Sequence, residues 1–298
     1  MSCSGGFRRL PQALAAARLT ATRIVQSNIT SALILEDDAD WDVRLKTQMQ
    51  QFAQAATAFT VPVQGQTRAE QCRVLPNPEL SIAHDISDLP LPHLTPYGDD
   101  WDVLWLGHCG TEFPTTTAPD KPPHLRVVIE NDATVPPAKH LKPHPFALPD
   151  ALAEKYPPHT RVVHASSGTA CTQAYAVSQQ GARRLLSRFG LRTLTAGWDL
   201  MLRDWCDGLY TAAKDAEADD GRKRAPVCVT VQPPLFSHHY GMGSASDIVA
   251  PGGGFVNLDK EMTPYVRVSV RLNMGRLVEG EEGREQWEEE AASPTKAA

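Results

Sequence analysis

Long apolar runs and basic blocks are both missing from this sequence of 298 residues. The longest apolar stretches, Ala32–Leu35 and Val227–Val231, fall far short of the roughly 20 residues that a membrane-spanning helix requires. Lys and Arg number 29 against 35 Asp and Glu, and the chain has no long Lys/Arg-rich block that would follow a phosphate backbone. We therefore expect no transmembrane segment and no nucleic-acid partner.

The sequence has six cysteines, and none of them lie close together. No C-x-x-C pair occurs among Cys3, Cys72, Cys109, Cys171, Cys206 and Cys228. This spacing indicates neither a zinc site nor a dense disulfide scaffold, and it leaves the redox compartment open. Because the sequence shows no convincing signal or anchor, the chain as written is expected to be soluble and cytoplasmic.

Hydrophobic spacing predicts an α/β chain. The expected helices are 11–27, 42–59, 179–189 and 198–210, and the expected strands are 32–35, 101–106, 125–130, 169–177 and 227–231. Ala32–Leu35 is continuously apolar, which is typical of a central strand covered on both faces. Ser178 and Gly190 are suited to begin and end the helix between them.

The composition predicts one domain over residues 1–278. Proline-rich excursions from its core are expected over 61–100 and 113–160, where few regular elements can form. Residues 279–298 are rich in glutamate and are expected to form a disordered, solvated acidic tail.

Four acids within five residues, Glu36-Asp37-Asp38-Ala39-Asp40, directly follow the first expected strand. Their mutual repulsion is relieved by a cation, and carboxylate oxygens on one short turn suit Mg²⁺ or Mn²⁺ bound together with phosphate oxygens. Ligand sites of open α/β sheets gather at the carboxyl ends of strands, which favours a diphosphate site here. The alternative is that two of these acids cap the helix near Asp42 while the others are solvated.

Three segments, in order, resemble the motifs of glycosyltransferase family 25, with the fungal branch the nearest. They are Ser31–Trp41 (SALILEDDADW), Trp101–Gly107 (WDVLWLG), and Ala174–Ser178 (AYAVS) followed by Gly181–Leu186 (GARRLL). The resemblance implies a GT-A-like (Rossmann-like) sandwich with a mixed, mostly parallel sheet. It also implies inverting transfer of a hexose, galactose or glucose, from a UDP-sugar to a hydroxyl of a glycan, a lipid-linked acceptor or a protein.

For the donor site, the resemblance implies that Glu36, Asp37 and Asp38, with Asp40 in addition, hold the Mn²⁺ or Mg²⁺ and the diphosphate. His238 and His239 follow the last expected strand, where such enzymes commonly supply a further metal ligand, and imidazole suits Mn²⁺. His239 is the favoured ligand, because with Tyr240 it completes a His-Tyr pair that resembles one in the collagen galactosyltransferases. The alternative for His239 is an exposed loop histidine without a role.

Three further residues are candidates for contacts with donor or acceptor. Asp199 matches an acidic position of the family and is the candidate general base, although it is equally suited to the first turn of a helix. His108 is a candidate contact of nucleotide or acceptor, or a structural histidine. Trp105 is a candidate for stacking on sugar or base, or a core residue.

The resemblance fails at the amino terminus. Family members begin with a nucleotide-binding strand, and the 35 residues before Glu36 contain no candidate for it. A non-catalytic relative that acts as a binding module is therefore the main alternative, and an incomplete amino terminus would make the ER or Golgi the alternative location. A metal-dependent phosphohydrolase is less favoured, because neither a P-loop nor a nucleophile elbow is present.

Overall fold

The computed structural model describes residues 10–60, 79–82, 95–114, 125–141, 152–190, 196–210, 225–242 and 260–287. The helices are α1 (Leu10–Gln26), α2 (Leu45–Thr60), η2 (Ala138–His140), α4 (Leu152–Lys155), α5 (Gln179–Phe189), α6 (Trp198–Cys206) and α7 (Met274–Val278). The strands are β1 (Ser31–Leu35), β2 (Ala39–Trp41), β3 (Glu79–Ser81), β4 (Val103–Gly107), β5 (Arg126–Ile129), β6 (Arg161–Ala165), β7 (Ala174–Ser178), β8 (Cys228–Gln232) and β9 (Phe236–His238).

The strands form one open, mixed sheet of nine strands in the described part of the chain, in the order β1-β7-β4-β8-β6-β5-β3, with β2 paired to β9 and β9 to β4. The α/β class is confirmed, but the expected mostly parallel sheet is wrong. The parallel pairs β4/β8, β3/β5 and β4/β9 are outnumbered, because β1/β7, β4/β7, β6/β8, β5/β6 and β2/β9 are all antiparallel.

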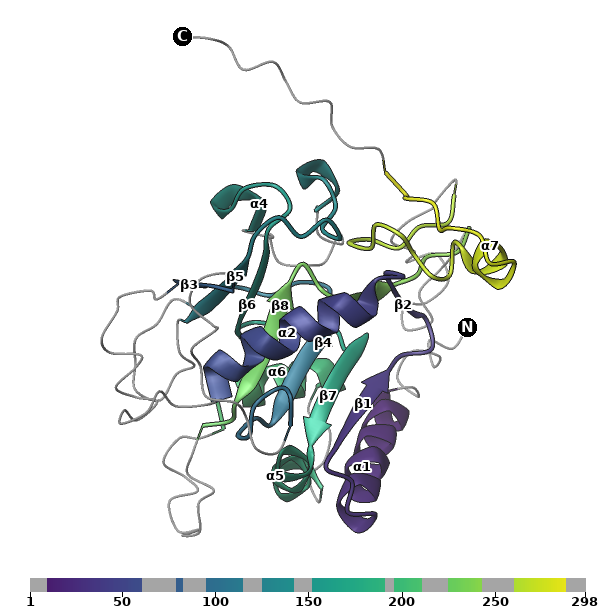
Figure 1. The fold of residues 1–298 in the computed structure, drawn as a ribbon. Helices are drawn as coiled ribbons and strands as arrows, with labels where there is room; N and C mark the ends of the chain where they lie inside the picture. Colours follow the sequence, from purple (N-terminus) through teal and green to yellow (C-terminus); the bar gives the residue numbers. More distant parts are fainter. Residues whose placement is uncertain are drawn as a thin grey trace, which may run out of the picture.

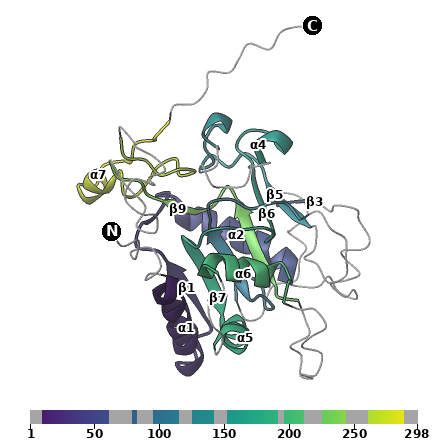
Figure 2. The same cartoon turned by 180° about the vertical axis from the view of Figure 1, so that it is seen from behind.

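Helices cover both faces of the sheet. Figure 1 shows α2 crossing one face, and Figure 2 shows α6 on the opposite face, with α1 and α5 nearby. Alternation along β4 explains the two layers, since Leu104 packs with Phe52 of α2 while Trp105 packs with Leu202 of α6. Each face thereby has its own hydrophobic core.

Helix α5 begins and ends where the sequence predicts. The Ser178 hydroxyl accepts a hydrogen bond of 2.9 Å from the Gly181 backbone N–H, and Gly190 is the C-cap. Gly181 lies so close to the sheet that a Cβ there would stand 2.2 Å from the carbonyl oxygen of Asp102. Only glycine allows this approach, which fixes α5 against the start of β4.

Strand β1 is an edge strand, so the prediction of a central strand covered on both faces is wrong. Ala32 and Ile34 pack against the core beneath α1, whereas 48% of Leu33 and 42% of Leu35 stay exposed on the other face. Helix α2 lies over β5, β6 and β8, so it leaves this end of the sheet uncovered.

The carboxyl-terminal segment returns to the body, which differs from the solvated tail expected from residue 279 onward. Arg267 Nη2 pairs with Glu285 Oε2 at 2.6 Å, and the Trp287 ring stacks on His140 with centroids 4.7 Å apart. The remaining tail, 288–298, lies outside the described residues, as do parts of the proline-rich stretches (61–78, 83–94, 115–124 and 142–151).

Two disulfides join Cys109 to Cys171 and Cys206 to Cys228. Such bonds persist in oxidising compartments, so they favour a secretory location over the cytoplasmic one expected for the chain as written. Among the helices that the structure describes, none has the length and hydropathy needed to span a membrane.

Candidate functional site

The acidic turn, Glu36–Asp38, lies between the end of β1 and the start of β2. Strand β2 pairs antiparallel with β9, with Ala39 opposite His238. This register brings His238 Nδ1 to 3.2 Å from Asp38 Oδ2, and the His239 backbone N–H donates to the Asp38 carbonyl oxygen at 2.9 Å. The segment that follows the last expected strand (227–231) therefore lies beside the acidic turn.

The Asp38 carboxylate has one oxygen engaged and one unengaged. Its Oδ2 faces His238, while Oδ1 is inaccessible to solvent and has no hydrogen-bond partner among the described residues. A buried carboxylate oxygen without a donor is unfavourable unless a ligand or cation satisfies it. Asp38 is thus the member of the acidic turn best placed to hold one.

Glu36 is held by the segment that precedes β7. Its Oε1 accepts a hydrogen bond of 2.8 Å from the Thr172 hydroxyl, and its backbone N–H donates to the Gln173 carbonyl oxygen at 3.0 Å. Burial raises the pKa of Glu36, and the negative charges of Asp38, Asp199 and Asp37 raise it further, against the opposing effect of the Thr172 hydrogen bond.

Asp199 lies in the first turn of α6, and its Oδ2 accepts a hydrogen bond of 3.2 Å from the Cys171 backbone N–H. Together with the influence of Asp199 on Glu36, this places the candidate base beside the acidic turn although 163 residues separate the two in the sequence, from 36 to 199. The carboxylates of Glu36, Asp38 and Asp199, which are half-buried, and of the exposed Asp37 therefore lie in one region, and a cation or cationic ligand would relieve their repulsion.

Asp40 lies elsewhere. Its side chain is fully buried, and both oxygens accept hydrogen bonds: Oδ1 from the backbone N–H groups of Trp41 (2.8 Å) and Arg271 (3.1 Å), Oδ2 from the hydroxyls of Thr263 (2.6 Å) and Ser269. With its lone pairs occupied and no access to solvent, Asp40 is not placed to bind a metal. Its role is to fasten the carboxyl-terminal segment to β2.

The histidine that faces the acidic turn is His238 and not the expected His239. His239 Nδ1 lies 3.1 Å from the Thr263 hydroxyl oxygen, on the Asp40 side. Burial lowers the pKa of His238, and His239 and Arg271 lower it further against the opposing charge of Asp38. A neutral imidazole beside a carboxylate is suited to metal coordination.

Neither His108 nor Trp105 is accessible to a nucleotide. His108 is buried, with Nε2 2.9 Å from the Val231 carbonyl oxygen, and burial lowers its pKa to about 4 in spite of that hydrogen bond. Trp105 is completely buried beneath α6, and its Nε1 donates to the Cys171 carbonyl oxygen at 2.8 Å. Both residues therefore have the structural role that the sequence left as their alternative.

Arg271 is a site residue that sequence reasoning missed. Its exposed side chain lies along the acidic turn, where Nε donates to the Ala39 carbonyl oxygen at 3.1 Å and Nη2 to the Asp37 carbonyl oxygen. Nothing in the sequence signals this placement, since 234 residues separate Arg271 from Asp37. A guanidinium fixed in this way supplies N–H donors suited to phosphate.

A metal fits this site only in part. Within the ranges that the structure describes, no three His, Cys, Asp or Glu side chains converge as ligands of one ion. Mg²⁺ and Mn²⁺ bound with a diphosphate need only one or two protein ligands, and Asp38 with its unsatisfied Oδ1, next to His238, meets that lower requirement. The expected set of Glu36, Asp38, Asp40 and His239 is not assembled.

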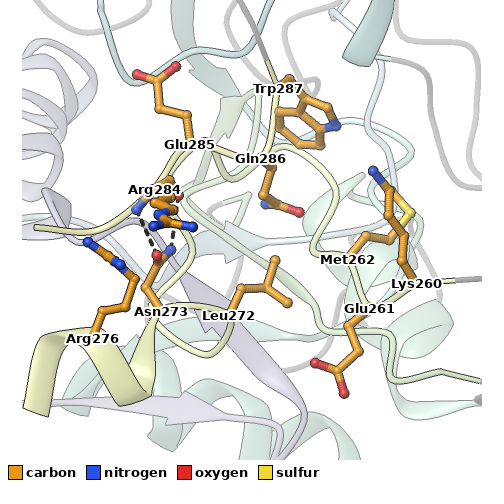
Figure 3. A pocket seen from close by; sticks show the side chains of 10 residues that line it. All are labelled: Lys260, Glu261, Met262, Leu272, Asn273, Arg276, Arg284, Glu285, Gln286 and Trp287. Carbon is orange, nitrogen blue, oxygen red and sulfur yellow. Dashed lines mark hydrogen bonds between the residues drawn. The ribbon is translucent and has the colours of Figure 1, made fainter.

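A separate cavity of about 330 Å³ lies in the carboxyl-terminal segment (Figure 3). Its lining includes Met262, Leu272, Arg284 and Trp287, and none of the residues predicted from the sequence belongs to it. Gln286 beside it donates to the Thr263 carbonyl oxygen at 3.0 Å, which ties this region to the Asp40 contacts.

No protein-family model, curated protein or solved structure matches this chain. Clustered carboxylates, a histidine and a fixed arginine at the end of an edge strand can bind a cation and a diphosphate together, and they can accept a proton from a bound hydroxyl.

Proposed function

We propose that this chain is a GT-A-like glycosyltransferase. It binds a nucleoside diphospho-sugar at the acidic turn and transfers the hexose, with inversion, to a hydroxyl of a glycan, a lipid-linked acceptor or a protein. One observation carries the proposal: Asp38 Oδ1 is inaccessible to solvent and has no hydrogen-bond partner in the part of the chain that the structure describes, and it lies just after a strand and beside His238. The family motifs around Glu36–Asp38 and the α/β sheet support it.

In this proposal, Asp38 and His238 hold Mn²⁺ or Mg²⁺ together with the diphosphate. When bound, the metal stabilises negative charge on the departing nucleoside diphosphate. Arg271 donates hydrogen bonds to phosphate oxygens from the other side of the turn, and its contacts with the carbonyl oxygens of Asp37 and Ala39 hold the guanidinium in place.

Asp199 acts as the general base. The acceptor oxygen forms a bond to the anomeric carbon as the bond from that carbon to the diphosphate oxygen breaks, and the hydroxyl proton passes to the Asp199 carboxylate. One Asp199 oxygen, Oδ2, is engaged by the Cys171 N–H, which fixes the orientation of the carboxylate. Direct displacement of this kind inverts the anomeric centre.

The test is titration of UDP into the purified chain by calorimetry, first with Mn²⁺ and then with EDTA. We expect Mn²⁺-dependent binding that Asp38→Asn weakens by at least about tenfold, because a charged ligand to the metal is lost. Glu130→Gln, an exposed carboxylate at the end of β5, is the matched control and should bind as the wild type does.

Turnover then separates the function classes. Release of UDP from a UDP-hexose, with transfer to an added acceptor, is the expected result. Binding without turnover would favour the non-catalytic binding module, and cleavage of UDP to UMP and phosphate would favour a phosphohydrolase. If UDP does not bind under either metal condition, the proposed donor site is wrong.

A further inference from the structure

Two of the proposed site carboxylates belong to elements that one short loop holds in place. Glu36 follows β1 and Asp199 belongs to α6, and both are contacted by the segment Cys171–Gln173, here called the site loop. The Thr172 hydroxyl donates to Glu36 Oε1 at 2.8 Å, and the Cys171 N–H donates to Asp199 Oδ2 at 3.2 Å. The position of the loop therefore determines the positions of both carboxylates.

The conformation of the site loop is unusual. Cys171 has a φ of 64°, in the left-handed region that non-glycine residues seldom adopt. Such a conformation persists only where the surroundings enforce it, and these conformations cluster at functional sites. The Cys171 carbonyl oxygen accepts a hydrogen bond of 2.8 Å from Trp105, which is completely buried, so the loop is anchored to the sheet.

The Cys109–Cys171 disulfide supplies the second anchor. Cys109 follows β4, and its backbone N–H also donates to the Ala170 carbonyl oxygen at 2.9 Å, while the Gln173 side-chain N–H lies 3.2 Å from Cys109 Sγ. The loop is thus tied to the end of β4 on both sides of Thr172. This crosslink is only partly buried.

The other disulfide offers a natural comparison. Cys206 and Cys228 are buried at 1% and 5% exposure in the core beneath α1, α5 and α6. Their bond joins α6 to β8 within the buried cluster that also contains Trp105, and neither cysteine belongs to the site loop. One crosslink therefore lies at the candidate site, and the other lies within the hydrophobic core.

We infer that the site loop, held by the Cys109–Cys171 disulfide, is the positioning element that brings Glu36 and Asp199 to the donor site. Thr172 and Cys171 act through those carboxylates and do not themselves contact the nucleotide. The expected effect on nucleotide binding rests on the proposed function. The placement of Glu36 and Asp199 by the site loop is a property of the fold and does not depend on that function. The site is then assembled only while this disulfide is intact.

The experiment uses the full oxidised chain and four variants. Cys109→Ser with Cys171→Ser removes the site crosslink, and Cys206→Ala with Cys228→Ala is the matched control. Thr172→Val removes the hydroxyl that holds Glu36, and Thr172→Ser restores it. For each we would measure UDP affinity with Mn²⁺ and the rate of backbone amide exchange across residues 168–175.

Loss of the site crosslink, and Thr172→Val, should each weaken UDP binding by at least about tenfold, while Thr172→Ser and the core-disulfide variant stay within about twofold of wild type. Equal affinity in the wild type, the site-crosslink variant and Thr172→Val would overturn the inference. Should the site-crosslink variant fail to fold, the comparison of Thr172→Val with Thr172→Ser still decides.

Amide exchange separates this inference from the proposed function. If the wild type does not bind UDP, the proposed function fails, and exchange alone then tests the positioning. Without the Cys109–Cys171 crosslink, the backbone amides of the site loop should exchange at least about tenfold faster than in the wild type. Without the Cys206–Cys228 crosslink, their exchange rates should not change. Unchanged exchange in the Cys109 variant would refute positioning by this disulfide.

Discussion

The Thr263 hydroxyl donates a hydrogen bond of 2.6 Å to Asp40 Oδ2 across 223 residues of sequence. Next to it, Asp42 Oδ2 accepts from the Val268 N–H at 2.9 Å, and the Val270 N–H donates to the Trp41 carbonyl oxygen at 3.0 Å. The acidic motif therefore divides by function. Glu36 and Asp38 lie half-buried in the candidate site with Asp37 exposed between them, whereas Asp40 and the following Asp42 hold the carboxyl-terminal segment.

This division predicts losses of stability of very different size for two acids of the motif, Asp40 and Asp37. Asp40→Ala removes an acceptor of four donors and leaves buried hydroxyl and N–H groups unsatisfied, so it should lower the free energy of unfolding by about 3 kcal/mol. Asp37→Ala changes an exposed carboxylate and should lower it by less than about 0.5 kcal/mol. Urea unfolding curves of the two variants and the wild type give the comparison.

A similar loss of stability in both variants would contradict the assignment. The midpoint and the slope must both be recorded, because a changed slope would mean that the carboxyl-terminal segment had detached from the native state.

A second prediction concerns the buried ion pair of Arg161 and Asp132. Arg161 Nε donates to Asp132 Oδ2 at 2.6 Å, and both side chains are almost fully buried. Burial alone would raise the pKa of Asp132, but Arg161 and hydrogen bonds from Thr134 bring it below its ordinary value. Asp132→Ala leaves a buried guanidinium unpaired and should cost about 3–5 kcal/mol of stability.

Removing both charges should cost less than removing one. In Asp132→Ala combined with Arg161→Met, no uncompensated charge remains, so part of the lost stability should return. A double variant that is as unstable as Asp132→Ala alone, in thermal or urea unfolding, would count against a charge-driven penalty.

A third prediction is acid sensitivity from two buried histidines. Burial lowers the pKa of His108 to about 4 and that of His164 to about 3, below the ordinary 6.5. The unfolded chain then binds protons that the folded chain does not, so stability is full above pH 6.5 and falls as the pH drops towards the folded values. Each histidine contributes a slope of about 1.4 kcal/mol per pH unit in that window.

His164→Gln tests this slope. Between pH 6 and pH 4.5, the unfolding free energy of the variant should fall less steeply with decreasing pH than that of the wild type. The difference in slope should be about 1.4 kcal/mol per pH unit, which corresponds to the binding of one proton. The same comparison with His159→Gln, a half-buried histidine, serves as the control. Parallel pH profiles for His164→Gln and wild type would show that His164 does not titrate as described.

Helices and strands with a regular hydrophobic pattern could be predicted from the sequence. Strands that contain buried polar or charged side chains could not. Helix α5 begins at its Ser178 cap, and the apolar segment expected as strand 227–231 forms β8, which lies inside the sheet. Strand β6 escaped prediction because it contains Arg161 and His164, whose burial becomes acceptable only through partners such as Asp132 and Gln232. Strand β2 escaped for the same reason, since its central residue is the buried Asp40.

The place of the candidate site in the fold could be predicted from the sequence, but not which residues it brings together. A strand followed by four acids pointed to this region, and Asp199 does lie near Glu36. Whether His238 or His239 faces Asp38 depends on the register of β2 with β9, and hydrophobic pattern does not determine it for such short strands. The cysteine pairs, 62 and 22 residues apart, likewise depend on which chain segments the sheet brings together.

The last prediction concerns Arg271 and rests on the proposed donor site. Arg271→Gln removes a fixed guanidinium beside Asp37, so affinity for UDP with Mn²⁺ should fall by about tenfold or more, whereas affinity for uridine should not change. Arg276→Gln is the matched control, because Arg276 is also partly exposed in this segment but pairs with Glu281 at 2.8 Å. Calorimetry with UDP, UMP and uridine would show whether the loss follows the number of phosphates, as a diphosphate contact requires. An equal loss for all three ligands would instead indicate that Arg271 acts only by holding the acidic turn in shape, through the carbonyl oxygens of Asp37 and Ala39.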